Sequence, residues 1–327
     1  MGSPVPIVDI SGFDGEGSAA RAGVVQEVSS ACEQTGFLVV VGHGVDLDLI
    51  AETYAVTAGF FALAEEEKLR CTPEGWDRYC GFAAMDTDGA GGAPPDLKEM
   101  FHANRFDGPE EAMAAGYPLE VALAQAPNLW PERPADFVSL WRRYYAAMAE
   151  LAERMDRIFA CCLGLDEAWF ADRFDRHLSN LSANWYPPQA VAPRAGQLRS
   201  GPHVDFSMLT ILYQDDAPGG LEVRDRGGEW RPVPPLEGSY VVNIGDLMDR
   251  FTDNRWRATP HRVVNPPREQ SGRGRISIPF FQMPNWDAVV ECVPTCRPSS
   301  GAPRYPPVLA GPHSEVRRSG RRPQMAV

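Results

Sequence analysis

The sequence GPHVDFSMLTILYQDDAPGGLEV, residues 201–223, contains the pattern from which the fold can be argued. Its middle part, residues 208–214, is a run of apolar, β-branched and aromatic residues, and such runs favour strands. The pair Gly219-Gly220 follows, and glycine permits the positive φ that a tight turn can require. The segment therefore predicts two short strands joined by a turn.

Similar β-prone runs, separated by turn residues, recur from about Leu178 to the end of the C-terminal half. They lie at 208–214, 221–225, 229–233, 239–245, 261–266 and 275–281. Short strands at this spacing are typical of an antiparallel sandwich or barrel. We therefore expect a β jelly roll in this half of the chain.

The chain before Phe174 has a mostly helical pattern. Helices are expected at 18–35, 47–69 and 134–162, a buried strand at 36–45 and a Gly- and Pro-rich loop at 84–95. The predicted fold class is mixed α and β, with N-terminal helices packed on the jelly roll. The predicted division is a helical N-terminal module (1–175), a jelly-roll core that forms one compact unit with it (176–310), and a C-terminal tail or lid (311–327).

The composition of the 327 residues limits the classes of partner. The formal net charge of -13 disfavours nucleic acids and anionic membranes, because like charges repel. Seven cysteines without a C-x-x-C pair fit a reducing compartment, and no apolar stretch reaches membrane-spanning length. We therefore expect a cytoplasmic protein whose partner is a small molecule. We also expect it to be a monomer.

The residues with the clearest chemistry are His203 and Asp205, followed 56 positions later by His261. Two imidazoles and one carboxylate on one face of a metal leave three positions open, which is the arrangement used for non-haem Fe(II) and O2. His203 and Asp205 are two apart, so on an extended segment they point to the same side. His261 is expected on another strand that faces them across the roll. An isolated H-x-D tripeptide is weak evidence for a metal site, so the surrounding sequence decides its meaning.

That surrounding sequence resembles the isopenicillin N synthase-like branch of the 2-oxoglutarate-dependent dioxygenases. The resemblance is carried by GPHVDFSMLTILYQDDAPGGLEV (201–223), VVNIGDLMDRFTDNRWRATPHRVVNP (241–266), RISIPFFQMPN (275–285) and NWYPP (184–188). Upstream, it continues in PIVDISGF (6–13), GFLVVVGHGV (36–45) and DLKEMFHANR (96–105). It implies a double-stranded β-helix with flanking helices, and Fe(II), 2-oxoglutarate and O2 as cofactor and co-substrates.

The resemblance also implies a clamp for 2-oxoglutarate. Arg275 and Ser277 lie two apart on one strand, and a guanidinium beside a hydroxyl suits a carboxylate. In the family this pair holds the distal carboxylate of 2-oxoglutarate, and Tyr186 would add a hydroxyl donor. Asn184 is a further candidate at this site, although a turn or strand-end role explains it equally well.

The substrate is expected to be a small molecule, most simply a specialised metabolite of the kind that antibiotic pathways use. A mainly apolar wall is predicted for its pocket. The candidate lining residues are Tyr79, Phe82, Met100, His102 and Phe281, with Phe280 as a further one. Loop 84–95 and the C-terminal tail are candidate lids.

The implied reaction is an oxidation by hydroxylation, desaturation or cyclisation, coupled to the decarboxylation of 2-oxoglutarate. One alternative is an oxidase of the isopenicillin N synthase type, which uses no 2-oxoglutarate and binds the carboxylate of its own substrate with the same Arg, Ser and Tyr. Two others are a non-catalytic binding protein on a jelly roll and a zinc hydrolase on a similar roll. Neither of these two needs Arg275 and Ser277 beside the three metal ligands.

Overall fold

The computed structural model describes residues 5–15, 17–73, 80–85, 94–124 and 127–319. Its main element is an eight-stranded sheet in which both halves of the chain take part. In spatial order its strands are β1 (Ile7–Asp9), β2 (Phe37–Val41), β10 (Tyr240–Ile244), β7 (Leu209–Gln214), β12 (Arg275–Gln282), β5 (Asn180–Tyr186), β4 (Glu99–Asn104) and β3 (Gly81–Ala83). All neighbours are antiparallel except β1 and β2, which pair in parallel.

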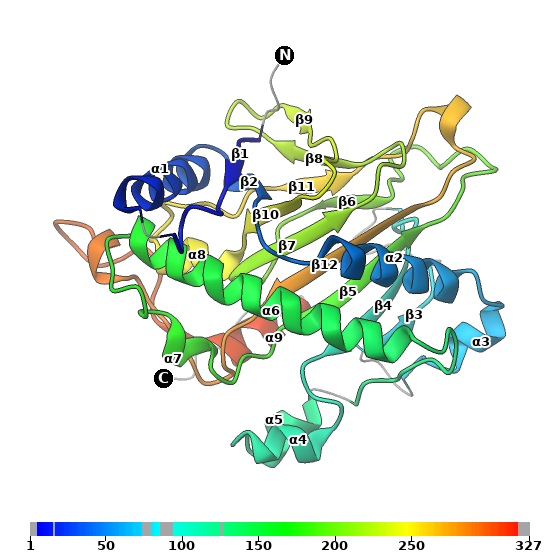
Figure 1. The fold of residues 1–327 in the computed structure, drawn as a ribbon, viewed down its shortest axis with the longest axis horizontal. Coiled ribbons are helices and arrows are strands. Elements are labelled where there is room, and N and C mark those ends of the chain that lie inside the picture. Colours follow the sequence, from blue (N-terminus) through cyan, green and yellow to red (C-terminus); the bar gives the residue numbers. More distant parts are fainter. Residues whose placement is uncertain (1–4, 16, 74–79, 86–93, 125–126, 320–327) are drawn as a thin grey trace.

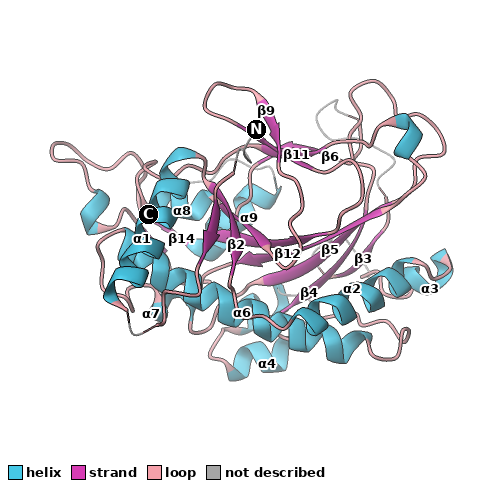
Figure 2. Ribbon diagram, turned by 45° about the horizontal axis from the view of Figure 1, so that its top comes forward, coloured by secondary structure: helices cyan, strands magenta, loops and turns pink. Residues whose placement is uncertain are grey.

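A smaller sheet lies over one face of the large one (Figures 1 and 2). Its strands, in spatial order, are β6 (Ser200–His203), β11 (His261–Val263), β8 (Leu221–Arg224) and β9 (Trp230–Pro232). Buried Phe37, Val39 and Val241 of the large sheet pack against Leu221 and Val223 of the small one. The two sheets therefore form the predicted jelly roll, and all six predicted β-prone runs contain a strand. A further pair, β13 (Val289–Val290) and β14 (Val308–Leu309), stands apart.

Helices cover the other face of the large sheet (Figure 2). The described helices are α1 (Ser18–Gln34), α2 (Leu47–Phe61), α3 (Glu65–Leu69), α4 (Pro109–Ala114), α5 (Leu119–Ala124), α6 (Phe137–Cys162), α7 (Ala171–Phe174), α8 (Asp246–Phe251) and α9 (Ala310–Ser319), with short 3-10 turns at Arg268–Gln270 and Pro294–Cys296. The apolar side chains of α6 recur every three or four positions, and Tyr144, Met148 and Met155 have no exposed surface. Each such side chain contributes roughly 1.5–3 kcal/mol through burial, so α6 is the main support of the sheet that carries the site.

One predicted helix, 47–69, is wrong as a single element, because the chain leaves the helical conformation at Ala64 (φ -57°, ψ 146°). Three glutamates open the next helix, α3, and negative charge favours a helix start at this place. The C-terminal tail forms the short helix α9 despite Pro312, since proline is tolerated in the first turn. Most of loop 84–95 lies outside the described residues.

Along the described parts of the chain, no helix combines the length and the apolar character that crossing a bilayer requires.

A buried carboxyl on α6 gives the first prediction. Asp156 is 5% exposed and accepts a hydrogen bond from Gln282 Nε2 at 2.6 Å. Burial raises the pKa of Asp156 well above its ordinary value, and Gln282 offsets this only in part. Because the folded state holds the proton more tightly than the unfolded one, this group costs stability as the pH rises above about 4. We expect Asp156→Asn, which resembles the neutral acid, to raise the Tm by an amount that grows between pH 5 and pH 8.

The measurement is thermal unfolding across that pH range beside Glu150→Gln, an exposed charge change on the same helix. The Tm of the control should change with pH in the same way as the Tm of the unmodified protein. A constant offset between Asp156→Asn and the unmodified protein at every pH would contradict a buried, protonated Asp156.

Candidate metal centre and co-substrate site

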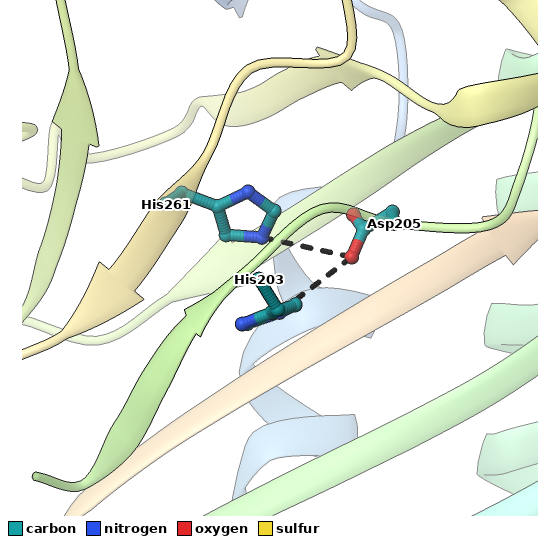
Figure 3. Close-up of side chains that lie close together, drawn as sticks. All are labelled: His203, Asp205 and His261. Carbon is teal, nitrogen blue, oxygen red and sulfur yellow. Dashed lines mark ion pairs between the residues drawn. The ribbon is translucent and has the colours of Figure 1, made fainter. Parts of the chain in front are cut away.

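The three predicted metal ligands meet at the edge of the small sheet (Figure 3). His203 ends β6, His261 begins β11, and Asp205 lies just after β6. His203 and His261 are direct cross-strand partners in an antiparallel pair, with ring centroids 4.3 Å apart. The prediction that His261 faces the others from across the roll is therefore wrong. A hydrogen-bonded neighbouring strand brings it there.

The ring nitrogens of both histidines have defined roles. His203 Nδ1 donates to the carbonyl oxygen of Gly201 at 2.8 Å, and His261 Nδ1 donates to that of Thr259 at 3.2 Å. Since a carbonyl oxygen can only accept, Nδ1 carries the proton and Nε2 keeps its lone pair. The two Nε2 atoms lie 3.7 and 3.6 Å from Asp205 Oδ1. Among the described residues, these three offer ligand atoms that all lie within 4.8 Å of one another, which fits a shared metal ion.

Asp205 is fixed by its other oxygen. Oδ2 accepts from Thr210 Oγ1 at 2.6 Å and from Asn243 Nδ2 at 2.8 Å, so Oδ1 is turned toward the histidines. The backbone N–H of Asp246, the first residue of α8, donates to the Asp205 carbonyl at 2.9 Å. At Gly245, a Cβ atom would lie 2.0 Å from the Ser207 carbonyl oxygen, so only glycine permits this approach. The loop that carries Asp205 is thus held independently of any ligand.

The charges of the three groups are coupled. Burial would raise the pKa of Asp205, but the two histidines and the Asn243 hydrogen bond outweigh it and hold that pKa well below its ordinary value. Burial also lowers the pKa of His203, and the neighbouring His261 lowers it further. Asp205 is therefore a carboxylate and His203 is neutral near pH 7, which are the forms that bind a metal.

The hydroxyl of Thr210 provides a test of this arrangement. Thr210→Val keeps the shape of the side chain but removes one donor to Asp205 Oδ2. Loss of such an outer partner typically lowers metal affinity about 10- to 100-fold, and we expect a decrease in this range for Fe(II). Anaerobic Fe(II) titration measures it. The matched control is Thr53→Val, a buried hydroxyl in α2 with no hydrogen-bond partner among the described residues, and equal affinities in the two variants would contradict the assigned role.

The predicted carboxylate clamp lies on the face of the large sheet that looks toward the small one. Arg275 of β12 is opposite Tyr186 of β5, and Ser277 is opposite Asn184. Because side chains alternate along a strand, these four share one face. Arg275, Tyr186 and Ser277 are each at most 2% exposed, and Asn184 is partly exposed. The structure therefore brings together all four residues of the predicted clamp.

The Arg275 guanidinium is only partly satisfied within the protein. Nη2 donates to Gln214 Oε1 at 3.0 Å, and Nε lies 3.9 Å from Asp215 Oδ1. Nη1 is buried and has no hydrogen-bond partner in the described structure. Since an unsatisfied buried cationic donor is costly, this atom fits a site for an external anion. A carboxylate such as that of 2-oxoglutarate meets this requirement.

The sequence did not point to a second arginine at this site. Arg199 is fully buried and donates to the carbonyl oxygens of Pro218 and Gly219 at 2.6 and 2.8 Å. Arg199 and Arg275 lie over the same Tyr186 ring, at 5.7 and 5.3 Å from its centroid. Burial and the charge of Arg275 lower the pKa of Arg199 to about 10. No motif marks Arg199, whereas Asn243, a polar residue inside the apolar run 240–244, could have been noticed as a buried group in need of a partner.

The candidate substrate-lining residues divide between the two faces of the sheet. The strand register places Met100, His102 and Phe281 on the same face as the clamp. Phe82 and Phe280 point the other way, into the core beneath the helices, where Phe82 packs on Phe60 and Phe280 on Tyr145. These two are therefore wrong as lining residues. Tyr79 lies outside the described residues.

Comparisons with known proteins agree with this geometry. Residues 5–133 match the family model of the non-haem dioxygenase in morphine synthesis N-terminal region, and residues 176–284 match the 2OG-Fe(II) oxygenase superfamily. A 2-oxoglutarate-Fe(II) type oxidoreductase of Aspergillus fumigatus is 35% identical over 93% of this chain and 89% of its own length. Validamycin A dioxygenase of Streptomyces hygroscopicus is 33% identical over 95% of this chain and 85% of its own length.

Solved structures give the same result. A full-length Neurospora crassa protein in complex with alpha-KG is 26% identical, with a TM-score of 0.84 over 97% of this chain and 96% of its own. A 2OG-Fe(II) oxygenase family protein from Caulobacter crescentus is 29% identical, with a TM-score of 0.84 over 98% of this chain and 99% of its own. With these similarities and the His-Asp-His group in place, the chain belongs to the Fe(II)- and 2-oxoglutarate-dependent dioxygenases.

Proposed function

We propose that in this dioxygenase His203, Asp205 and His261 bind Fe(II), while Arg275, Ser277 and Tyr186 hold the distal carboxylate of 2-oxoglutarate. Asn184 completes this side of the site. The observation that carries the proposal is the buried Nη1 of Arg275, which has no partner among the described residues and lies in the same roll as the histidine and aspartate ligands. A zinc hydrolase or a non-catalytic roll has no use for such an unpaired guanidinium atom.

When bound, Fe(II) with 2-oxoglutarate and O2 supplies the oxidising chemistry, with release of succinate and CO2. The protein orients the metal ligands and limits the access of water. Thr210 and Asn243 turn one oxygen of Asp205 toward the metal, and the backbone carbonyls of Gly201 and Thr259 orient the two imidazoles. The apolar layer between the sheets closes the roll behind them and limits the entry of water.

The substrate is a small molecule, and we propose a specialised metabolite that is hydroxylated, desaturated or cyclised. Support comes from the names of similar proteins, which include validamycin A dioxygenase and a homoarginine-6-hydroxylase of rice that is 31% identical over 94% of both chains. The similar Neurospora crassa protein has also been solved in complex with thymine. Each of these names refers to a small polar molecule rather than to a macromolecule.

The test of the proposed function is co-substrate turnover. The purified protein, loaded with Fe(II) under anaerobic conditions, is mixed with 2-oxoglutarate and O2, and succinate is measured. We expect succinate to form slowly without added substrate and faster with one. Iron bound at one equivalent without any consumption of 2-oxoglutarate would instead support the oxidase alternative.

A further inference from the structure

The wall of the roll along β4 and β5 is polar, although the sequence predicted a mainly apolar one. On the face shared with the clamp, β4 presents Met100, His102 and Asn104, and β5 presents Asn180, Ser182 and Asn184. Five of these six side chains are polar. The intervening residues, Phe101, Ala103, Leu181 and Ala183, are at most 2% exposed and pack beneath the helices.

These polar side chains bond to one another in a row. Ser182 Oγ donates to Asn180 Oδ1 at 2.7 Å, so it accepts from His102 Nδ1 at 2.5 Å. Asn180 Nδ2 in turn donates to Asn104 Oδ1 at 2.8 Å. A connected row of this kind fixes the orientation of its members. Along these two strands the roll therefore has an ordered, hydrogen-bonding lining, which suits a polar substrate better than a hydrocarbon.

Lys98 stands at the end of this wall nearest the metal ligands. It directly precedes β4, and strand alternation places it on the same face as Met100 and His102. Its Nζ donates to Ser200 Oγ at 3.1 Å, and Ser200 lies on the strand that ends in His203. Burial is the main cause that lowers the pKa of His102, and the positive charge of Lys98 lowers it further.

The ammonium of Lys98 is largely enclosed and has capacity for another partner. Its side chain is 18% exposed. An ammonium has three donors, and the described partners are Ser200 and Asp96, whose Oδ2 lies 3.2 Å away. Asp96 is itself shared, since it also accepts from Gly201 N at 2.8 Å and from Ser200 Oγ at 3.1 Å. Two acceptors are therefore described for the three donors of Lys98, which leaves one N–H for a further acceptor.

We infer that Lys98 binds the carboxylate of a small polar acid and so positions this substrate beside the metal. This inference rests on the proposed function, since it names the substrate class for the same site. A carboxylate, with one negative charge, suits a single ammonium that already has an acidic neighbour, Asp96, better than a doubly charged phosphate does. The polar row from His102 to Asn104 continues along the same face of the roll.

The experiment compares acids with their neutral counterparts. The probes are shikimate, 3-hydroxybutyrate and L-homoarginine, each beside its primary amide. Binding is followed anaerobically by the change in the visible absorbance of the Fe(II)–2-oxoglutarate complex. Saturating 2-oxoglutarate prevents the acids from occupying the Arg275 clamp. We expect the acids to bind about tenfold more tightly than the amides. This gain in affinity lies between the small contribution of an exposed ion pair and the large one of a buried pair.

Three variants test whether Lys98 binds the substrate carboxylate, in which case it is an anchor, or only supports the fold. Lys98→Met should abolish the preference for acids, while Fe(II) affinity and Tm remain unchanged. Ser200→Ala removes the hydrogen bond to Lys98 but not its charge, and should keep the preference within about twofold. Asp96→Asn removes the competing carboxylate, while its amide oxygen still accepts from Gly201 N, and should increase the affinity for acids severalfold because Lys98 is less neutralised.

The outcomes distinguish a failure of the Lys98 inference from a failure of the proposed dioxygenase function. Equal binding of acids and amides to the unmodified protein would overturn the anchor, and so would a Lys98→Met variant that loses Fe(II) or weakens both classes alike. An Asp96→Asn variant with no gain for acids would also count against it. Succinate formation without any probe would show that the dioxygenase function stands even if the anchor fails, whereas its absence would refute the proposed function itself.

Discussion

Arg275→Ala is expected to raise the KM for 2-oxoglutarate by about 30-fold or more. The guanidinium is 1% exposed, and its Nη1 has no partner among the described residues. Loss of one partner from a desolvated, hydrogen-bonded charge pair costs roughly 2–5 kcal/mol, and every 1.4 kcal/mol corresponds to a factor of ten. The measurement is succinate formation as a function of 2-oxoglutarate concentration, with Fe(II) saturating.

Arg273→Ala is the matched control for this prediction. Arg273 lies two residues before Arg275, its side chain is 54% exposed, and its ion pair is with Asp216 on the surface. Exposed pairs contribute little, so the KM of this variant should stay within about twofold of the unmodified value. An unchanged KM in Arg275→Ala would show that the distal carboxylate is held elsewhere, and Arg199 would be the next residue to substitute.

Asp205→Ala is expected to abolish turnover and to lower Fe(II) affinity by more than the 10- to 100-fold typical of an outer partner such as Thr210. The variant removes the only carboxylate of the three ligands and leaves two neutral imidazoles. The fold should persist, because backbone bonds hold this loop. The N–H groups of Asp246 and Gly245 donate to the carbonyls of Asp205 and Met208 at 2.9 and 3.0 Å.

Fe(II) titration, succinate formation and thermal unfolding together test this prediction. Asp216→Asn, with a side chain that is 76% exposed, is the control for the loss of one negative charge. Full iron occupancy and normal turnover in Asp205→Ala would refute the metal assignment. A variant that fails to fold would show instead that the hydrogen bonds of this carboxylate with Thr210 and Asn243 are needed to form the loop.

The sequence predicted the elements of the fold well where the pattern was long or repeated. The helix 134–162 appears as α6, and each β-prone run after Leu178 contains a strand. It failed at 47–69, where the run of Ala and Glu favours a helix on both sides of residues 62–64. Local propensity carries no information about the extended backbone at Ala64, which precedes the separate helix α3.

The residues of the proposed metal centre and clamp were also chosen from the sequence, because His, Asp, Arg and Ser at strand spacing suggest their chemistry, and the structure brings them together. Their arrangement was not. His261 lies on the neighbouring strand of His203 rather than across the roll, since the pairing of β6 with β11 joins segments that are far apart in the chain. In the same way, no local pattern predicts the contacts of Arg199 with Tyr186 and of Lys98 with Ser200.

The sequence by itself determined the helical pattern of the first half and the β pattern of the second, the residue types of the proposed metal and co-substrate sites, and the family that the chain resembles. The tertiary structure alone decided which face of the sheet each residue occupies. Phe82 and His102 show the difference, since one lies in the core and the other lines the roll. The physical reason is that side chains alternate with a period of two, so a shift of register by one residue exchanges core and site. That register is fixed by long-range strand pairing, which no local pattern records.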